Sequence, residues 1–269
     1  MKCPHCQAEN ENTAKFCTSC GAQLSPETKT ALKAITSGGT VLGGAARQAR
    51  LKEAVDPSAI VGDRVYNGAI GAMLLWGFLT NYLLCLKVGS FTHMFPTMSP
   101  AVFLIGYFVV AIAGVMVTNR AQNPLIAFLG YNLTVLPFGL VISTAVEAYG
   151  GISSNAVTQA FLYTMIIAVA MGATAIVFPQ FFEKIGTALG AVLIALILCE
   201  VILLIFRVNQ IVTSWIAAGL FSCYLGYDIY RSQQFPKTVT NAIRASLDIY
   251  MDLANLFLRL LEIFGRKDD

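Results

Sequence analysis

Long apolar blocks recur along the chain from Tyr66 onward, and the connections between them are short and mostly polar. A membrane-spanning helix needs about 20 predominantly apolar residues. Six blocks are clear candidates, at about 66–87, 101–119, 124–146, 157–179, 186–206 and 209–230, and a seventh, weaker block at about 246–264 carries several charges. Because little chain is left for other structure, the pattern predicts an all-α integral membrane protein in which residues 61–269 form one seven-helix transmembrane bundle.

The first 60 residues are polar and contain no apolar core of the kind that a cleavable signal peptide requires, so we expect none. We predict a cysteine-containing head at 1–24 and a flexible linker, rich in Gly, Ser and Thr, at 25–60, with at most a short helix around 45–55. Only 12% of the residues are charged, against about 25% in soluble domains, which agrees with a membrane protein. A net charge of +3 gives no basis for nucleic-acid binding.

The distribution of basic residues predicts the orientation of the bundle. Between the head and the first apolar block lie Lys29, Lys33, Arg47, Arg50, Lys52 and Arg64. The positive-inside rule therefore places the N-terminus in the cytoplasm, together with the connections at 120, 183–184 and 231–244. Seven crossings would put Arg266 and Lys267 outside, which the rule disfavours. We prefer a full crossing of the last helix, and a re-entrant helix stays open as the alternative.

The head contains two Cys-x-x-Cys pairs, CPHC and CTSC, ten residues apart. Each pair can point two thiolates at one ion, and two pairs complete the tetrahedron of a zinc ribbon. We therefore predict one structural zinc ion, whose binding stabilises a segment too short for a core of its own, held by Cys3, Cys6, Cys17 and Cys20. Two disulfides would need an oxidising compartment, which the expected absence of a signal peptide disfavours. Ribbons of this kind commonly dock other proteins, so a cytosolic protein is a candidate partner.

The seventh block contains the stretch SLDIYMDLANLFLRLL, which is apolar overall and yet carries two carboxylates four residues apart. On a helix, its polar residues fall within about 80° of one another and form a single stripe. The stripe consists of Asp248, Asp252, Asn255, Arg259 and Glu262. A charged side chain at the centre of a bilayer costs about 2.5–3.5 kcal/mol, so such a residue marks a candidate functional site. Glu200 and Asp228, in the two preceding blocks, are candidates for the same reason.

Two interpretations of the stripe are open. The helix can lie on the membrane surface, although such helices usually have a polar face rich in Lys and Arg. Alternatively it is the central helix of the bundle. Asp228 then lies about one turn from the cytoplasmic end of the preceding helix, and Asp252 lies about two turns into the last helix from that same end. A hairpin then brings Asp228 and Asp252 face to face. Two carboxylates in contact at low dielectric share one proton, and one pKa rises towards neutrality, which predicts a pH sensor.

The segments GYDIYRS and ASLDIYMDLANLFLRLLEIFG closely resemble the closing signature of the Bax inhibitor-one (transmembrane Bax inhibitor motif) family, and a looser similarity extends over residues 61–269. The resemblance implies a bundle of seven helices in which six surround the last. It also implies a pH-sensitive calcium leak in which Asp228 and Asp252 act as a proton-dependent latch. A basic residue at the start of the third helix is thought to hold the closed state, and Arg120 is the nearest match. Asp248 replaces a small neutral residue of the family pattern, and the zinc ribbon is an addition.

We therefore expect a cation leak channel, with calcium as the transported ion and Asp228, Asp252, Asp248, Asn255 and Arg120 on its pathway. A membrane regulatory or scaffold protein, for example a modulator of membrane proteolysis that docks through the ribbon, is the alternative. An intramembrane aspartyl protease would need Gly-x-Gly-Asp and Pro-Ala-Leu motifs that the chain lacks, so we expect no enzymatic activity. In the plainest alternative, the acids only make hydrogen bonds inside the bundle and conduct nothing.

Overall fold

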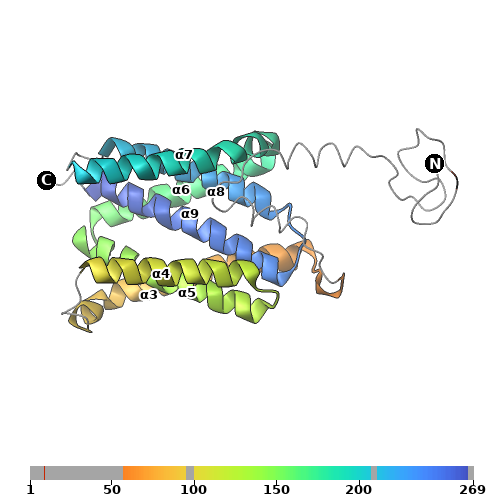
Figure 1. Ribbon diagram of the computed structural model, residues 1–269, viewed down its shortest axis with the longest axis horizontal. Helices are drawn as coiled ribbons and strands as arrows, with labels where there is room; N and C mark the ends of the chain where they lie inside the picture. The colour runs from red at the N-terminus through yellow and green to blue at the C-terminus, as the bar shows by residue number, and fades with distance from the viewer. Residues whose placement is uncertain (1–8, 10–56, 95–99, 207–210, 266–269) are drawn as a thin grey trace. The chain divides into compact units, whose positions relative to one another are not determined.

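A computed structural model describes residue 9 and residues 57–94, 100–206 and 211–265 of this protein (Figure 1). The chain divides into two compact units, Met1–Val41 and Leu42–Asp269. Within the second unit the described residues form a short 3-10 turn, Pro57–Ala59, and seven α-helices. The helices are α3 (Asp63–Met94), α4 (Pro100–Arg120), α5 (Pro124–Ala148), α6 (Asn155–Val177), α7 (Pro179–Ile205), α8 (Ile211–Ser232) and α9 (Val239–Gly265). The predicted all-α, seven-helix bundle is confirmed; the predicted ribbon, linker and 45–55 helix lie outside the described residues.

Local sequence signals set the ends of α5 and α6. The Asn123 side chain accepts a hydrogen bond from the Leu125 amide (2.8 Å), and Pro124 follows it as the first helical residue, a combination that favours helix initiation. At the start of α6, Ser154 Oγ accepts from the Val157 amide (3.2 Å). Between the two helices, Gly150 and Gly151 have φ angles of +93° and +82°, which residues with a side chain rarely adopt.

The helices differ in how apolar they are. By length and composition, α5, α6 and the 63–87 part of α3 can each cross a membrane, and α7 adds a fourth if its two parts, which meet at a 54° bend, form one span. The apolar part of α4, Ile105–Arg120, is shorter. Six clear apolar spans were predicted, which is more than the structure shows. One predicted span that is not apolar enough to count is α8, in which Ser214, Tyr224 and Asp228 are buried inside the protein. A helix that hides polar residues from lipid need not be uniformly apolar.

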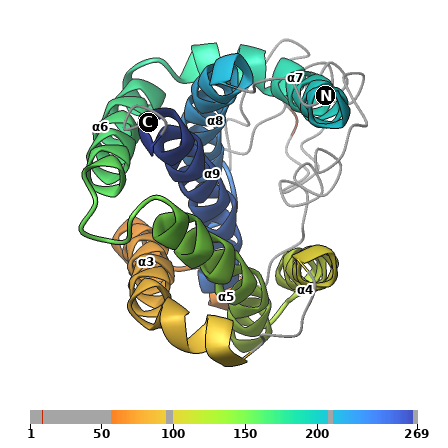
Figure 2. The same ribbon diagram turned by 90° about the vertical axis from the view of Figure 1, so that its left-hand side faces the viewer.

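The last helix, α9, lies at the centre of the bundle, as predicted (Figure 2). It packs against α3, α4, α5, α6 and α8. None of its described residues is exposed, whereas many large apolar side chains of α3–α8 are. The interpretation of α9 as a surface helix is therefore wrong. Its polar stripe is covered by protein, and the apolar outer faces of the other helices form the lipid-facing surface.

Helix α9 begins at Val239, seven residues before the predicted start at 246. The added turns contain Asn241 and Arg244, both buried, and their side chains are hydrogen-bonded to one another (2.9 Å). Asn241 Nδ2 also donates to the carbonyl of Pro236 (2.9 Å). Hydropathy alone misplaced the boundary because these polar residues are satisfied by contacts inside the bundle, and Asp252 consequently lies near the middle of α9 rather than two turns from its end.

The connection between α8 and α9 is anchored to the start of α3. Lys237 Nζ forms an ion pair with Asp63 (2.7 Å), and the Lys237 carbonyl accepts from the Val61 amide (2.8 Å). The buried Tyr66 hydroxyl donates to the Ser232 carbonyl (2.7 Å). These contacts fix the end of the bundle at which the α8–α9 hairpin turns.

Helices α4 and α5 approach each other closely at small residues. A Cβ atom on Gly130 would lie 2.5 Å from the backbone nitrogen of Thr118, and one on Gly114 would lie 2.8 Å from the backbone nitrogen of Thr134. Small residues permit such backbone contact between membrane helices, where van der Waals packing replaces the hydrophobic effect.

We expect Gly130→Ala to lower the free energy of unfolding by about 1–3 kcal/mol, because the added methyl group meets backbone and must separate the two helices. Gly68→Ala in α3 is the matched control, because a Cβ there meets nothing within 4 Å, and helix propensity favours Ala over Gly by about 1 kcal/mol. Denaturant titration of the purified protein in detergent measures both changes. Equal stability of the two variants would contradict the close α4–α5 packing.

Candidate functional site

Two buried carboxylates lie on the central helix α9 and on α8, which packs against it. Asp228, in the last turns of α8, is 4% exposed, and Asp252, near the middle of α9, is 6% exposed. One turn before Asp228 on α8, Leu225 belongs to the same apolar cluster as Ile249 and Leu253 of α9. The structure thus brings together the segments of α8 and α9 that carry the two predicted latch residues.

The other predicted residues of the stripe are partly buried. Asp248 lies one turn before Asp252 on α9 and takes part in interactions within the bundle. The Asn255 side chain donates from Nδ2 to the carbonyl of Met251 (2.8 Å), a contact within its own helix. Asp248 and Asp252 are therefore the two adjacent acids in the first half of the stripe, and Asn255 is tied to the α9 backbone.

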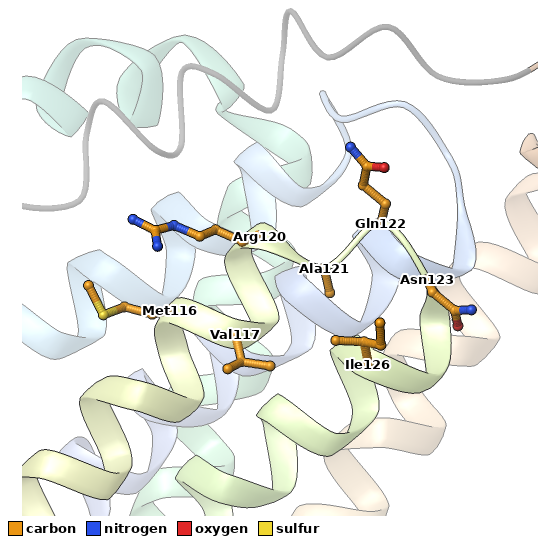
Figure 3. Close-up of a pocket in the computed structure, with 7 residues that line it drawn as sticks. All are labelled: Met116, Val117, Arg120, Ala121, Gln122, Asn123 and Ile126. Carbon is orange, nitrogen blue, oxygen red and sulfur yellow. The ribbon is translucent and has the colours of Figure 1, made fainter.

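Arg120 is the last residue of α4 rather than the first of the third helix, α5. Its side chain is exposed and extends from the end of α4, away from Asn123 and Ile126, at the rim of a surface pocket (Figure 3). Among the described residues it has no ion-pair partner within 4 Å. Its assignment to the ion pathway stays a prediction.

A different arginine, Arg244, occupies the buried position near the acids. It is 2% exposed and lies one turn before Asp248 on α9. Its guanidinium donates from Nε to the carbonyl of Thr118 (3.3 Å) and from Nη2 to the carbonyl of Ala121. The free carbonyl groups at a helix C-terminus carry partial negative charge, so a cation there is favourable. Arg244 thus joins α9 to the end of α4.

Sequence reasoning counted Arg244 only as a loop charge, because the helix was expected to begin after it. The available signal was the spacing Arg244–Asp248–Asp252, which repeats every four residues and therefore keeps the three side chains near one face of a helix. On α8, Arg231 is turned towards aromatic rings instead: its guanidinium carbon lies 5.6 Å from the ring centre of Tyr227 and 5.9 Å from that of Phe235.

The second half of the polar stripe forms an ion-pair network between three helices. Arg259 of α9 contacts Glu200 of α7 (2.7 Å) and Glu262 of α9 (3.6 Å). Glu262 accepts a hydrogen bond from Ser214 of α8 (2.7 Å). The stripe is therefore divided: its first half carries Asp248 and Asp252, with Arg244 one turn before them, and its second half ties α7 and α8 to the central helix.

No cluster of three or more His, Cys, Asp or Glu side chains that could hold a metal ion occurs in the described part of the chain. The predicted zinc ligands, Cys3, Cys6, Cys17 and Cys20, lie outside the described residues. Cys85, Cys199 and Cys223 are free cysteines.

Comparison with known families gives two matches. The family described as "Inhibitor of apoptosis-promoting Bax1" matches residues 63–269, and the zinc-ribbon domain family matches residues 2–24. The first match covers the entire helical bundle, and the second contains both Cys-x-x-Cys pairs.

Curated relatives are similar over part of the chain. An uncharacterized protein of Helicobacter pylori (strain J99) is 30% identical over 141 residues, which cover 51% of this chain and 57% of that protein. One from Campylobacter jejuni is 31% identical over 134 residues, 49% of this chain and 54% of that protein. A Golgi anti-apoptotic protein of vaccinia virus (strain Lister) is 28% identical over 168 residues, 61% of this chain and 69% of that protein. The chain thus spans little more than half the length of these bacterial relatives.

The Arg259–Glu200 pair should contribute more to stability than an exposed pair does. Its side chains are only 24% and 18% exposed, whereas those of the Lys237–Asp63 pair are 28% and 75% exposed. We expect a double-mutant cycle with Arg259→Met and Glu200→Gln to give a coupling energy of about 1–3 kcal/mol, against about 0.2–1 kcal/mol for Lys237→Met and Asp63→Asn. Unfolding free energies in detergent provide both values, and equal couplings would contradict a structural role for the network.

Proposed function

The chain belongs to the family of inhibitors of apoptosis-promoting Bax1, and from this premise we propose that it is a pH-sensitive cation leak channel of the cytoplasmic membrane. Protonation of an Asp228–Asp252 pair gates the pathway, and calcium is the ion that crosses. The protein is an integral membrane protein, and its N-terminus faces the cytoplasm in this proposal.

The observation that carries the proposal is the burial of two carboxylates in contacting segments of α8 and α9, the latter enclosed by five other helices. A bundle needs no carboxylate in its interior for stability, since apolar side chains of similar size pack there at least as well. Ionisable residues retained inside a membrane bundle typically mark ion or proton pathways.

Protonation changes the interaction between two neighbouring carboxyl groups. While they share one proton, a hydrogen bond between them holds α8 to α9. When both are ionised, they repel each other in a medium of low dielectric, and this repulsion favours separation of the two helices. Along these helices, Asp248 lies four residues before Asp252 and Arg231 lies three residues after Asp228, and the fields of these charges bias the pair.

Calcium suits this pathway because it is a hard cation that binds carboxylate and carbonyl oxygens with flexible geometry. Asp252 and Asp248 lie one turn apart, and Asp228 comes from the neighbouring helix. The proposed ion interacts with these oxygens in passing while both carboxyl groups are ionised, so ion entry and proton loss are coupled.

We expect Asp228→Asn and Asp252→Asn each to flatten the dependence of calcium flux on pH in proteoliposomes, because Asn has the size of Asp but does not titrate. Glu147→Gln, which alters an exposed carboxylate at the end of α5, is the matched control and should retain the wild-type profile. Flux is measured with a calcium-sensitive dye inside the vesicles while the external pH is varied.

Superimposable flux–pH curves for the wild type and both Asn variants would contradict gating by the pair. An absence of calcium flux through the wild type at every pH would contradict the leak itself and would leave the plainer role, in which the acids only make hydrogen bonds inside the bundle.

A second candidate function is regulation through a cytosolic protein that docks on the zinc ribbon. The match of residues 2–24 to the zinc-ribbon domain family favours it, because the ribbon is additional to the 63–269 bundle. In this proposal Cys3, Cys6, Cys17 and Cys20 hold one structural zinc ion, which supplies the folding energy of the head. The vaccinia relative is named as anti-apoptotic, and for this chain we propose a regulatory role, for example in membrane proteolysis.

We expect Cys17→Ser together with Cys20→Ser to abolish stoichiometric zinc binding and to remove the docked protein from pulldowns of the full chain, because two thiolates are too few to hold the ion. Cys223→Ser, which changes a free cysteine of α8, is the control and should change neither result. Zinc content is measured by elemental analysis, and captured proteins by mass spectrometry. Unchanged capture after loss of zinc would remove the ribbon from the interaction.

A further inference from the structure

A crevice of about 540 Å³ opens beside the central helix, on the side of the bundle formed by α3 and α6. Leu75 and Phe161 stand at its outer rim and are exposed, Leu75 by 69%. Its floor reaches Leu253 and Ala254 of α9, and Ala254 is only 1% exposed. The crevice therefore leads from the outer surface of the bundle to a helix that is otherwise covered by protein.

We propose that this crevice binds one acyl chain of a bilayer phospholipid, inserted from the side between α3 and α6. Its rim is continuous with the apolar surface that the bundle presents to lipid, since Leu75 and Phe161 belong to both. The volume falls within the range of about 300–1,000 Å³ that is typical of small-molecule sites. This site goes beyond the cation leak and does not depend on it.

The chemistry of the lining selects a hydrocarbon chain over water. Besides Tyr82 and Cys85, the lining contains three side chains with an amide or an aliphatic hydroxyl, and each of the three is hydrogen-bonded to protein: Asn81 to the Tyr250 hydroxyl (2.8 Å), Thr164 to the Ala160 carbonyl (2.7 Å) and Thr158 to the Ser154 carbonyl (3.1 Å). Water occupies a cavity when several polar groups there can hydrogen-bond to it, and apolar cavities stay dry. An empty crevice would lose the dispersion contacts of its walls, so a lipid tail from the adjacent membrane is the favoured occupant.

The crevice contacts the side of α9 that is turned away from the acidic stripe. Leu253, Ala254 and Phe257 lie about 100–200° around the helix from Asp252. A bound tail thus touches no carboxylate. It packs against the back of the helix that carries them and completes the protein packing that α3, α5 and α6 leave open there.

The test uses the full chain in phosphatidylcholine vesicles that contain a small fraction of phosphatidylcholine with a diazirine near the end of one tail. After irradiation, mass spectrometry maps the labelled residues. We expect label on Leu253, Ala254 and Phe257, together with label on the exposed, lipid-facing Val169 of α6, and none on Leu256, a fully buried α9 residue outside the crevice. Since Leu253 and Ala254 are buried and line the floor of the crevice, label reaches these two residues through the crevice.

Two variants close the crevice at different depths. Ala254→Leu fills the floor and Thr158→Trp blocks the rim, and each should lower the labelling of α9 several-fold while that of Val169 stays unchanged. Thr144→Trp is the matched control for Thr158→Trp, because Thr144 is also exposed and also donates to a carbonyl of its own helix (2.8 Å) but lies outside the crevice. If Ala254→Leu does not fold, the rim variant provides the same comparison.

Label on Val169 without label on α9 would overturn the proposal. In that case the crevice is closed to lipid, for example by a second copy of the chain that covers the rim. Label on α9 that persists at the wild-type level in Thr158→Trp and Ala254→Leu would also overturn it, because the tail would then reach α9 by another route. Neither result bears on calcium flux, so the site and the leak fail or stand separately.

Discussion

The requirement that a charged helix be kept away from lipid organises this protein. Helix α9 carries Arg244, Asp248, Asp252, Arg259 and Glu262, and each of these would be costly against hydrocarbon. Five helices pack around it, so that none of its described residues is exposed. The surrounding helices can then be apolar on their outer faces, and charged groups of α9 such as Arg244 and Arg259 bind other protein groups.

The charges of α9 are used in two different ways along its length. Arg259 and Glu262 are paired with side chains of α7 and α8, and Arg244 binds the carbonyl end of α4. The contacts of Arg259 and Arg244 connect α9 to α7 and α4, which otherwise share little surface with it. Asp228 and Asp252 lie on the α8–α9 pair, between these two sets of contacts. In the proposed gating, a change of their charge acts on this part of the pair.

The crevice between α3 and α6 gives α9 a second boundary. On one side the helix meets charged and polar groups of α4, α7 and α8, and on the other it meets an apolar opening that is continuous with the lipid-facing surface. Since apolar contact between membrane helices is no more favourable than contact with lipid, an acyl chain can replace a side chain there at little cost. The position of α9 then depends on lipid packing as well as on protein contacts.

The sequence by itself determined the number and order of the helices, the two-knuckle cysteine pattern of the ribbon, and the single polar stripe on α9, because hydropathy, ligand spacing and helical periodicity are local properties. It also identified Asp228 and Asp252 as the unusual acids. Only the tertiary structure decided that Arg244 belongs to α9 and binds α4, that Arg259 pairs with Glu200, and that Arg120 is exposed at a helix end. Arg244 and Thr118 are 126 residues apart, and Arg259 and Glu200 are 59 residues apart. Such partners are chosen by how the helices pack, and no local pattern in one sequence records that choice.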